Sequence, residues 1–176
     1  MEWLWIDLAN SDWRDRVGEE SEDRLANPKW RKDFLKRWSL PALSETDERD
    51  LTGMRDALRR AALALSAGDA IAPKDLAHLN RTLASTPVVR TIIKHGDDYR
   101  LNVAPPARTT GSAAWQAAMS FAEFLETADP TRLRLCDNCR WVFVDETRSR
   151  TRRWCDAGCG NVIRLREFRE RHRTGG

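Results

Sequence analysis

Four cysteines near the carboxyl end constrain this chain more than any other feature. They are arranged as Cys136-x2-Cys139 and Cys155-x3-Cys159, with fifteen residues between the two pairs. Two close cysteine pairs at this separation are typical of a structural zinc site, because each pair forms a knuckle and the intervening segment brings both knuckles to one tetrahedral ion. We therefore predict one structural Zn²⁺ ion, held by Cys136, Cys139, Cys155 and Cys159. Four thiolates would leave no open position for zinc catalysis.

Two other interpretations of the cysteines are weaker. Two disulfides would require an oxidising compartment, and a redox dithiol would not need the second pair. The first residues, MEWLWIDLANSDW, include Glu2 and Asp7 and lack the basic leader of a signal peptide. No apolar run approaches the roughly 18 residues of a membrane helix. We therefore expect a cytoplasmic protein without a membrane segment, whose reduced thiols bind metal.

Charge is distributed unevenly along the chain. Residues 131–176 contain twelve arginines, no lysine and six acidic residues, a net charge of +6, whereas the whole chain carries +3. Residues 1–130 therefore carry −3. A basic end on an acidic body predicts that the basic end binds a polyanion.

Residues 1–130 predict a mainly helical body. Apolar residues recur at steps of three and four, as on the buried face of a helix, in four segments: residues 28–38, 44–67, 73–85 and 112–127. Ser44 and Gly68 are typical start and stop residues for the longest segment. The third segment is expected to bury a stripe of Leu76, Leu79 and Leu83.

Two shorter stretches of the body have β-type patterns. VVRTIIK and YRLNVA flank HGDD, which predicts a β-hairpin with a tight turn. WLWIDLANS, residues 3–11, alternates apolar and polar residues and indicates either a half-buried strand or an irregular leader. In the same stretch, Asp7, Asn10 and Asp12 are candidates for lining a small-ligand pocket, although capping and turn roles explain them equally well.

The cysteine segment predicts a small finger. Residues 141–145 alternate in character and TRRW returns the chain to Cys155, so we expect a hairpin with its turn near residues 146–149. A helical pattern begins at the second cysteine pair. Knuckle, hairpin and helix in this order indicate a treble-clef-like finger. The predicted fold class is α+β, with a mainly helical domain at residues 1–130 that includes a β-hairpin and a zinc finger at residues 131–176.

The finger helix has two kinds of face. Leu165, Phe168 and His172 form one stripe, which we expect to pack on the finger. Arginines lie beside this stripe and in the preceding hairpin, and arginine suits phosphate because its planar fork donates two parallel hydrogen bonds. The predicted nucleic-acid contacts are Arg148, Arg150, Arg152, Arg153, Arg164, Arg166, Arg169 and Arg173. Alternatively, some of these arginines neutralise the zinc–thiolate centre or pair with acids along the helix.

These residues resemble a known family of bacterial proteins, in which a zinc finger of the CGNR type follows an N-terminal domain called ABATE. The segments that carry the resemblance are RLRLCDNCRWVFVD, RTRRWC and CGN at residues 159–161, supported by WIDLANS near the start. Members of the family are regarded as candidate stress-induced transcription regulators. The resemblance implies an α+β N-terminal domain, a zinc-binding finger and a DNA-binding role. Val162 stands where the arginine of the CGNR motif is expected.

The sequence therefore favours a bacterial transcription regulator that binds double-stranded DNA through its finger. A zinc-stabilised module that docks an acidic protein and an RNA-binding protein are the alternatives. A winged helix-turn-helix in residues 51–104 is disfavoured, because its second helix offers only Lys74 and Arg81 to phosphates. No Gly-rich phosphate loop, GxSxG or HExxH is found, so we do not expect an enzyme. A small-molecule effector of residues 1–130 and a homodimer stay open.

Overall fold

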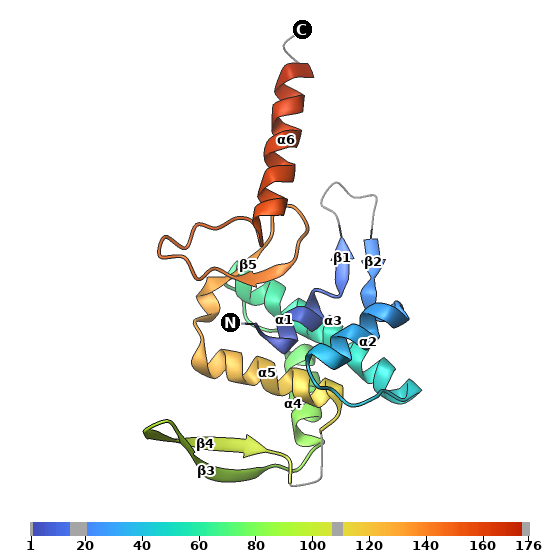
Figure 1. Cartoon of the computed structure of the whole chain (residues 1–176), viewed down its shortest axis with the longest axis vertical. Coiled ribbons are helices and arrows are strands. Elements are labelled where there is room, and N and C mark those ends of the chain that lie inside the picture. Colours follow the sequence, from blue (N-terminus) through green and yellow to red (C-terminus); the bar gives the residue numbers. More distant parts are fainter. Residues whose placement is uncertain (1, 15–20, 107–110, 174–176) are drawn as a thin grey trace.

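The computed structural model describes residues 2–14, 21–106 and 111–173, which form a helical body with a small finger at one end and a β-hairpin at the other (Figure 1). The elements of the body are α1 (Leu4–Ala9), β1 (Asp12–Arg14), β2 (Ser21–Asp23), η1 (Arg24–Ala26), α2 (Pro28–Arg37), α3 (Glu45–Ala67), α4 (Pro73–Ala84), β3 (Val89–His95), β4 (Asp98–Ala104) and α5 (Ala113–Thr127). The finger follows with η2 (Pro130–Arg132), β5 (Leu133–Leu135), β6 (Val142–Val144) and α6 (Ala157–Arg173). The predicted α+β class is confirmed.

Helix α3 lies at the centre of the body and packs against α1, α4 and α5. It begins in a capping box, because the Ser44 hydroxyl accepts from the Asp47 N–H while the Asp47 carboxylate accepts from the Ser44 N–H. It ends at Gly68, whose φ of 81° is the left-handed conformation that a glycine adopts without steric cost. The predicted bounds of this helix are thus confirmed, together with the physical reason for each end.

Both interpretations of residues 3–11, a half-buried strand and an irregular leader, are wrong, because residues 4–9 form helix α1. Leu4, Trp5, Leu8 and Ala9 are buried, and this spacing places them on one face of a helix. The Trp5 ring meets Phe121 and Phe124 of α5 at centroid distances of 5.0 and 5.1 Å. A run of neighbouring apolar residues fits both periodicities, and the aromatic contacts with α5 favour the helix.

Helix α4 buries less than its sequence predicts. Leu79 is buried and Leu83 partly buried, but Leu76 is 46% exposed, so the expected three-leucine stripe is wrong at its first position. Asp75 is buried beside it and accepts hydrogen bonds from the Arg60 guanidinium at 2.7–3.1 Å. An ion pair with α3 therefore fixes the start of α4, where the sequence suggested only apolar packing.

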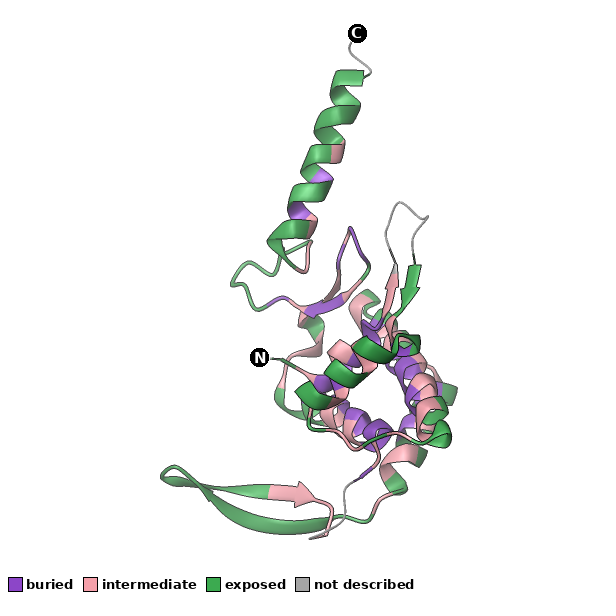
Figure 2. Cartoon of the chain, turned by 45° about the vertical axis from the view of Figure 1, so that its right-hand side comes forward, coloured by how far each residue is buried: buried purple, intermediate pink, exposed green. Residues whose placement is uncertain are grey.

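Strands β3 and β4 form the predicted hairpin, which projects from the body (Figures 1 and 2). Its tight turn includes Gly96 with a φ of 62°. The strands are solvated over most of their length, and Ile92, Tyr99 and Leu101 are 78%, 72% and 65% exposed. The hairpin therefore adds little to the core of the described chain.

The finger joins the body through its first hairpin. Strands β5 and β6 pair antiparallel with Leu133 opposite Val144, and the side chains of Leu133 and Val142 are buried in the core of the body. The first cysteine knuckle forms the connection between these two strands. The predicted hairpin with its turn at residues 146–149 is thus wrong, because Val142–Val144 pairs with the strand before the knuckle rather than with residues 151–154.

Helix α6 stands away from the rest of the molecule (Figure 2). Only Gly160 and Ile163 of its residues are buried. The expected packing of Leu165, Phe168 and His172 on the finger is therefore wrong, since all three side chains are exposed. None of the described helices is long and apolar enough to cross a bilayer.

Candidate metal centre and arginine-rich helix

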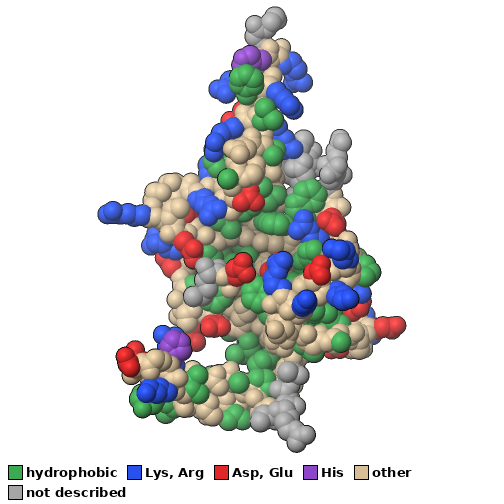
Figure 3. Space-filling view, in the orientation of Figure 1, with side chains coloured by type: hydrophobic (Ala, Val, Ile, Leu, Met, Phe, Trp, Pro, Cys, Tyr) green, Lys and Arg blue, Asp and Glu red, His purple; other side chains and the backbone are tan. Residues whose placement is uncertain are grey.

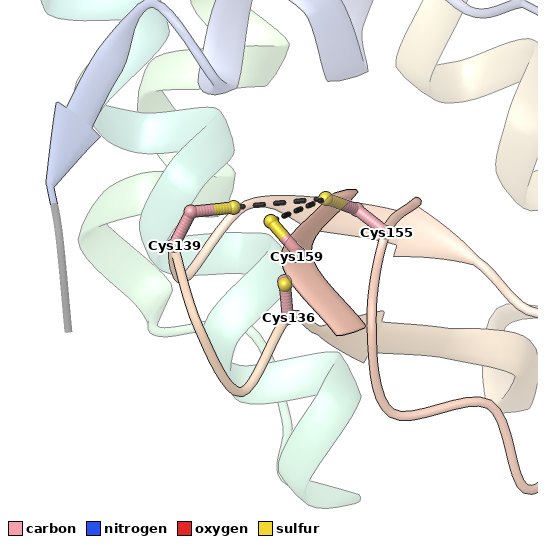
Figure 4. A group of neighbouring side chains, drawn as sticks. All are labelled: Cys136, Cys139, Cys155 and Cys159. Atoms are coloured by element: carbon pink, nitrogen blue, oxygen red, sulfur yellow. Dashed lines mark hydrogen bonds between the residues drawn. The ribbon is translucent and has the colours of Figure 1, made fainter. Parts of the chain in front are cut away.

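The four cysteines converge on one point (Figure 4). Cys136 and Cys139 lie in the knuckle after β5, Cys155 in the loop before α6, and Cys159 in the first turn of α6. Their four sulfur atoms lie within 4.8 Å of one another, with Cys139 Sγ 3.6 Å from Cys155 Sγ and Cys155 Sγ 3.7 Å from Cys159 Sγ. A tetrahedron of sulfurs about 2.3 Å from zinc has edges of about 3.8 Å. The sulfur positions therefore fit one Zn²⁺ ion, and all four cysteines are free thiols.

Proton affinities differ among these thiols. A hydrogen bond joins the sulfurs of Cys139 and Cys155, and it is the main cause that lowers the pKa of Cys139 to about 6. The same bond, together with burial, raises the pKa of Cys155, and burial raises that of Cys159 to about 12. Zinc binds thiolates and displaces their protons, so its affinity for this site falls as the pH falls.

Residues next to the cysteines orient them. Asn138 donates from Nδ2 to Cys159 Sγ at 3.4 Å, and its Oδ1 accepts from Arg166 at 3.1 Å. Asp156 caps α6, because its Oδ1 accepts from the Cys159 N–H at 2.7 Å. The knuckle, the second cysteine pair and the helix are therefore linked by side chains as well as by the metal.

Asp145 holds the loop between the two cysteine pairs. Its side chain is fully buried, and Oδ1 accepts from the N–H and hydroxyl of Thr147 at 2.9 and 2.5 Å, while Oδ2 accepts from the Arg152 N–H at 2.9 Å. The hydrogen bond from the Thr147 hydroxyl is the main cause of the lowered pKa of the Asp145 carboxyl. The sequence predicts that strand pairing holds this loop. In the structure, hydrogen bonds to the buried Asp145 carboxylate fix residues 147–152 instead.

Comparison with protein families agrees with this architecture. Residues 2–128 match the model of the ABATE family, whose description is "Putative stress-induced transcription regulator". The chain belongs to the ABATE family. Residues 132–172 match the CGNR zinc finger, so the resemblance inferred from the sequence is confirmed for both parts. With the sulfur geometry, this match confirms the prediction of one structural zinc ion. A comparison with curated proteins found no match.

The glycine of the CGN segment in this ABATE-family chain has a packing role. A Cβ atom added to Gly160 would lie 3.2 Å from the Trp154 ring. The guanidinium carbons of Arg153 and Arg164 lie 5.4 and 5.6 Å from the centroid of the same ring. Gly160 therefore lets the indole lie directly on the helix backbone, where the arginines cover it. Val162, at the position that names the motif, is 39% exposed.

Four of the eight predicted nucleic-acid contacts have partners in the finger or in the residue segment just before it. Arg150 pairs with Asp129 at 3.2 Å and Arg153 with Asp137 at 2.7 Å. Arg152 donates to the carbonyl oxygens of Trp154 and Cys155, and Arg166 donates to Asn138. These guanidinium groups hold loops together in the present structure, and the spacing of arginines in the sequence gave no sign of these partners.

The other four arginines are exposed. Arg148 and Arg169 are exposed and form no hydrogen bond or ion pair with any described residue. Arg164 is exposed beside Trp154, and Arg173 pairs with Glu170 at 3.7 Å in a contact between two exposed side chains. An exposed pair of this kind contributes little free energy. Figure 3 shows basic side chains along both sides of α6.

The polar residues near the start of the chain have structural partners. Asn10 donates from Nδ2 to the Val142 carbonyl at 2.9 Å, and its Oδ1 accepts from the Val142 N–H at 2.8 Å. Asp7 Oδ2 accepts from Arg37 and from the Trp38 indole at 3.0 and 2.8 Å. Sequence reasoning missed the role of Asn10, because its partner is 132 residues away.

A pocket of about 270 Å³ lies between α1, the end of α2 and strand β6. Asp7 and Asn10 line it with Trp38 and Glu146, whereas Asp12 is not part of its wall and lies 3.8 Å from Arg59. Of the three polar residues considered as pocket-lining candidates, Asp7 and Asn10 therefore line a pocket and Asp12 does not. A small-molecule effector of residues 1–130 stays a prediction.

Proposed function

We propose that this ABATE-family protein is a transcription regulator that binds double-stranded DNA through α6 and the adjoining loop. The observation that carries the proposal is the position of α6. The zinc centre and Asp156 hold its first turn, while residues 164–173 are largely exposed and carry five arginines and two glutamates, a net charge of +3. A helix about 10–12 Å across fits the major groove of DNA, whose walls are lined by phosphates.

Four of the eight arginines already hold loops together in the structure, so only the other four are proposed as phosphate contacts. Arg150, Arg152, Arg153 and Arg166 already serve the finger fold, so their removal would confound a binding experiment. The proposed phosphate contacts are therefore Arg148, Arg164, Arg169 and Arg173. No catalytic activity is part of the proposal, because four thiolates complete the tetrahedral coordination of zinc.

The proposal is tested with the zinc-loaded full chain in a salt titration of duplex binding. Each neutralised phosphate contributes about 0.9 to the slope of log affinity against log salt concentration. We expect Arg169→Ala/Arg173→Ala to weaken duplex binding and to reduce the slope by about 2. The matched control is Arg90→Ala/Arg100→Ala, which removes two exposed charges from the hairpin at the other end of the body.

Three results would redirect the proposal. Equal loss of binding in the α6 variant and in the hairpin control would mean that general positive charge, not the finger, attracts the duplex. Stronger binding to RNA or to single strands in competition would favour the RNA interpretation. Absence of duplex binding at low salt would favour an acidic protein as the partner of the same basic face.

A further inference from the structure

Helix α6 exposes an apolar stripe in the middle of its basic surface. Val162, Leu165 and Phe168 are 39%, 49% and 51% exposed and follow one another at steps of three residues. His172 extends the stripe, with its ring 4.0 Å from that of Phe168. None of these side chains belongs to either apolar cluster of the described residues. Three large apolar side chains in a row on an otherwise charged helix indicate a contact surface.

Arginines lie on both sides of the apolar residues. At 100° per residue, Leu165, Phe168 and His172 lie within about 60° of one another, Arg169 and Arg173 lie on one side of them together with Val162, and Arg164 and Arg171 lie on the other side. Glu167 and Glu170 fall on the opposite face of the helix. The partner of the stripe is therefore negative on both sides and apolar along the middle.

The major groove of DNA has this chemistry. Its two walls are phosphate backbones, and the thymine C5 methyl is the apolar group that base pairs present on its floor. A second α6 would instead bring arginine rows of the same sign together, which is unfavourable. A lipid surface requires a broad apolar face, whereas the stripe is three side chains over about 9 Å of helix. The geometry favours the groove.

We propose that Val162, Leu165 and Phe168 contact thymine methyl groups, and that Val162 makes this finger select a T·A pair. The proposal rests on the duplex binding proposed above, and it adds which base the helix recognises. An arginine at the position of Val162, as in the motif that names the CGNR finger, could donate to O6 and N7 of guanine. Valine has no donor, so at this position it recognises a methyl group instead.

The experiment begins with selection of bound duplexes by the zinc-loaded full chain from a random pool. Each thymine of the selected site is then replaced singly by deoxyuracil, which removes only the methyl group. We expect affinity to fall about fourfold at each contacted position, the value of one buried methyl group. In Val162→Ala, replacement of the thymine that Val162 contacts should no longer lower the affinity. Val162→Arg should select guanine at that position.

Leu63→Ala is the matched control, because Leu63 is 37% exposed on α3 and lies outside the finger. It should retain the full thymine preference of the parent chain. Zinc content and helical circular dichroism should be unchanged in every variant, since the substituted side chains are exposed.

Several results would overturn the proposal. Equal affinity for thymine and deoxyuracil at every position, selection of the same base by Val162→Arg, or recovery of no motif would each refute methyl reading while duplex binding itself stood. Loss of binding to anionic phosphatidylglycerol vesicles in Leu165→Ala, with no change on DNA, would assign the stripe to a membrane. Absence of any duplex binding would refute this proposal and the proposed function together.

Discussion

Among the residues that the structure describes, twenty are buried in the apolar core of the body, and Leu133 and Val142 of these come from the finger. The separate cluster inside the finger has Cys136, Cys139 and Phe143 as its buried members. Two of those three are zinc ligands. The body is therefore stabilised mainly by apolar burial, and the finger by a metal and by buried polar groups such as Asp145. The same chain thus uses two different sources of stability, and they should respond differently to the same perturbation.

The largest expected difference follows removal of zinc. Chelation, or Cys155→Ser, should unfold the cysteine knuckle and residues 145–173, because structural zinc sites contribute about 10–16 kcal/mol to folding. Amide hydrogen exchange should show loss of protection in α6, while α3 and α5 remain protected. Persistent protection of α6 in metal-free protein would mean that the finger does not depend on the ion.

A cavity in the body should destabilise the body and leave the metal site intact. Leu58 is fully buried in α3, so Leu58→Ala should lower the free energy of unfolding by about 2–5 kcal/mol in denaturant titrations. The variant should still bind one zinc ion per chain. The exposed control Leu63→Ala should change stability by less than about 0.5 kcal/mol. Loss of zinc from Leu58→Ala under native conditions would show that the finger depends on the body core.

Asn10 connects the two regions, and its replacement should affect both. Asn10→Ala removes two buried hydrogen bonds and leaves the N–H and C=O of Val142 without partners, which should cost about 2 kcal/mol. Exchange should accelerate in β6 as well as in α1. Asn80→Ala, on the exposed side of α4, is the control. A change confined to α1 would mean that the link is not needed by the finger.

The smallest expected effect is a dependence of body stability on pH. Hydrogen bonds from Arg60 lower the pKa of Asp75. A lowered folded-state pKa stabilises the body above the ordinary value of about 3.9, and this contribution is lost as the pH falls through the folded value. Asp75→Asn should therefore be less stable than the parent by about 1 kcal/mol at pH 7, with the difference shrinking below pH 4. A difference that stays constant to pH 2.5 would contradict this.

Local signals in the sequence were sufficient for the long helices and the metal ligands. The capping box at Ser44, the left-handed Gly68 and the Gly96 turn are each determined by neighbouring residues, and cysteine spacing determines a knuckle in the same way. The short α1 was missed because six residues, five of them apolar, fit a strand as well as a helix. Only its packing against α5 decides between them.

Long-range polar contacts could not be predicted from the sequence. Asn10 and its partner Val142 are 132 residues apart, and no local pattern in either segment indicates that they form hydrogen bonds with each other. Likewise, the spacing of the arginines does not distinguish Arg153, which pairs with Asp137, from Arg169, which points into solvent. The apolar stripe of α6 was predicted correctly, but its packing on the finger was not. Periodicity shows which side chains share a helix face, and it does not show whether another element covers that face.

The position of α6 also has a consequence for the thermodynamics of any complex. Beyond Arg166, which donates to Asn138, no residue of the helix is buried, and an isolated helix of this length is only marginally stable in water. A partner that contacts the last turns therefore completes the helix as it binds. Part of the interaction free energy is spent on ordering those turns, so association should be enthalpically favourable and entropically opposed, with an affinity that rises when the helix is stabilised in advance.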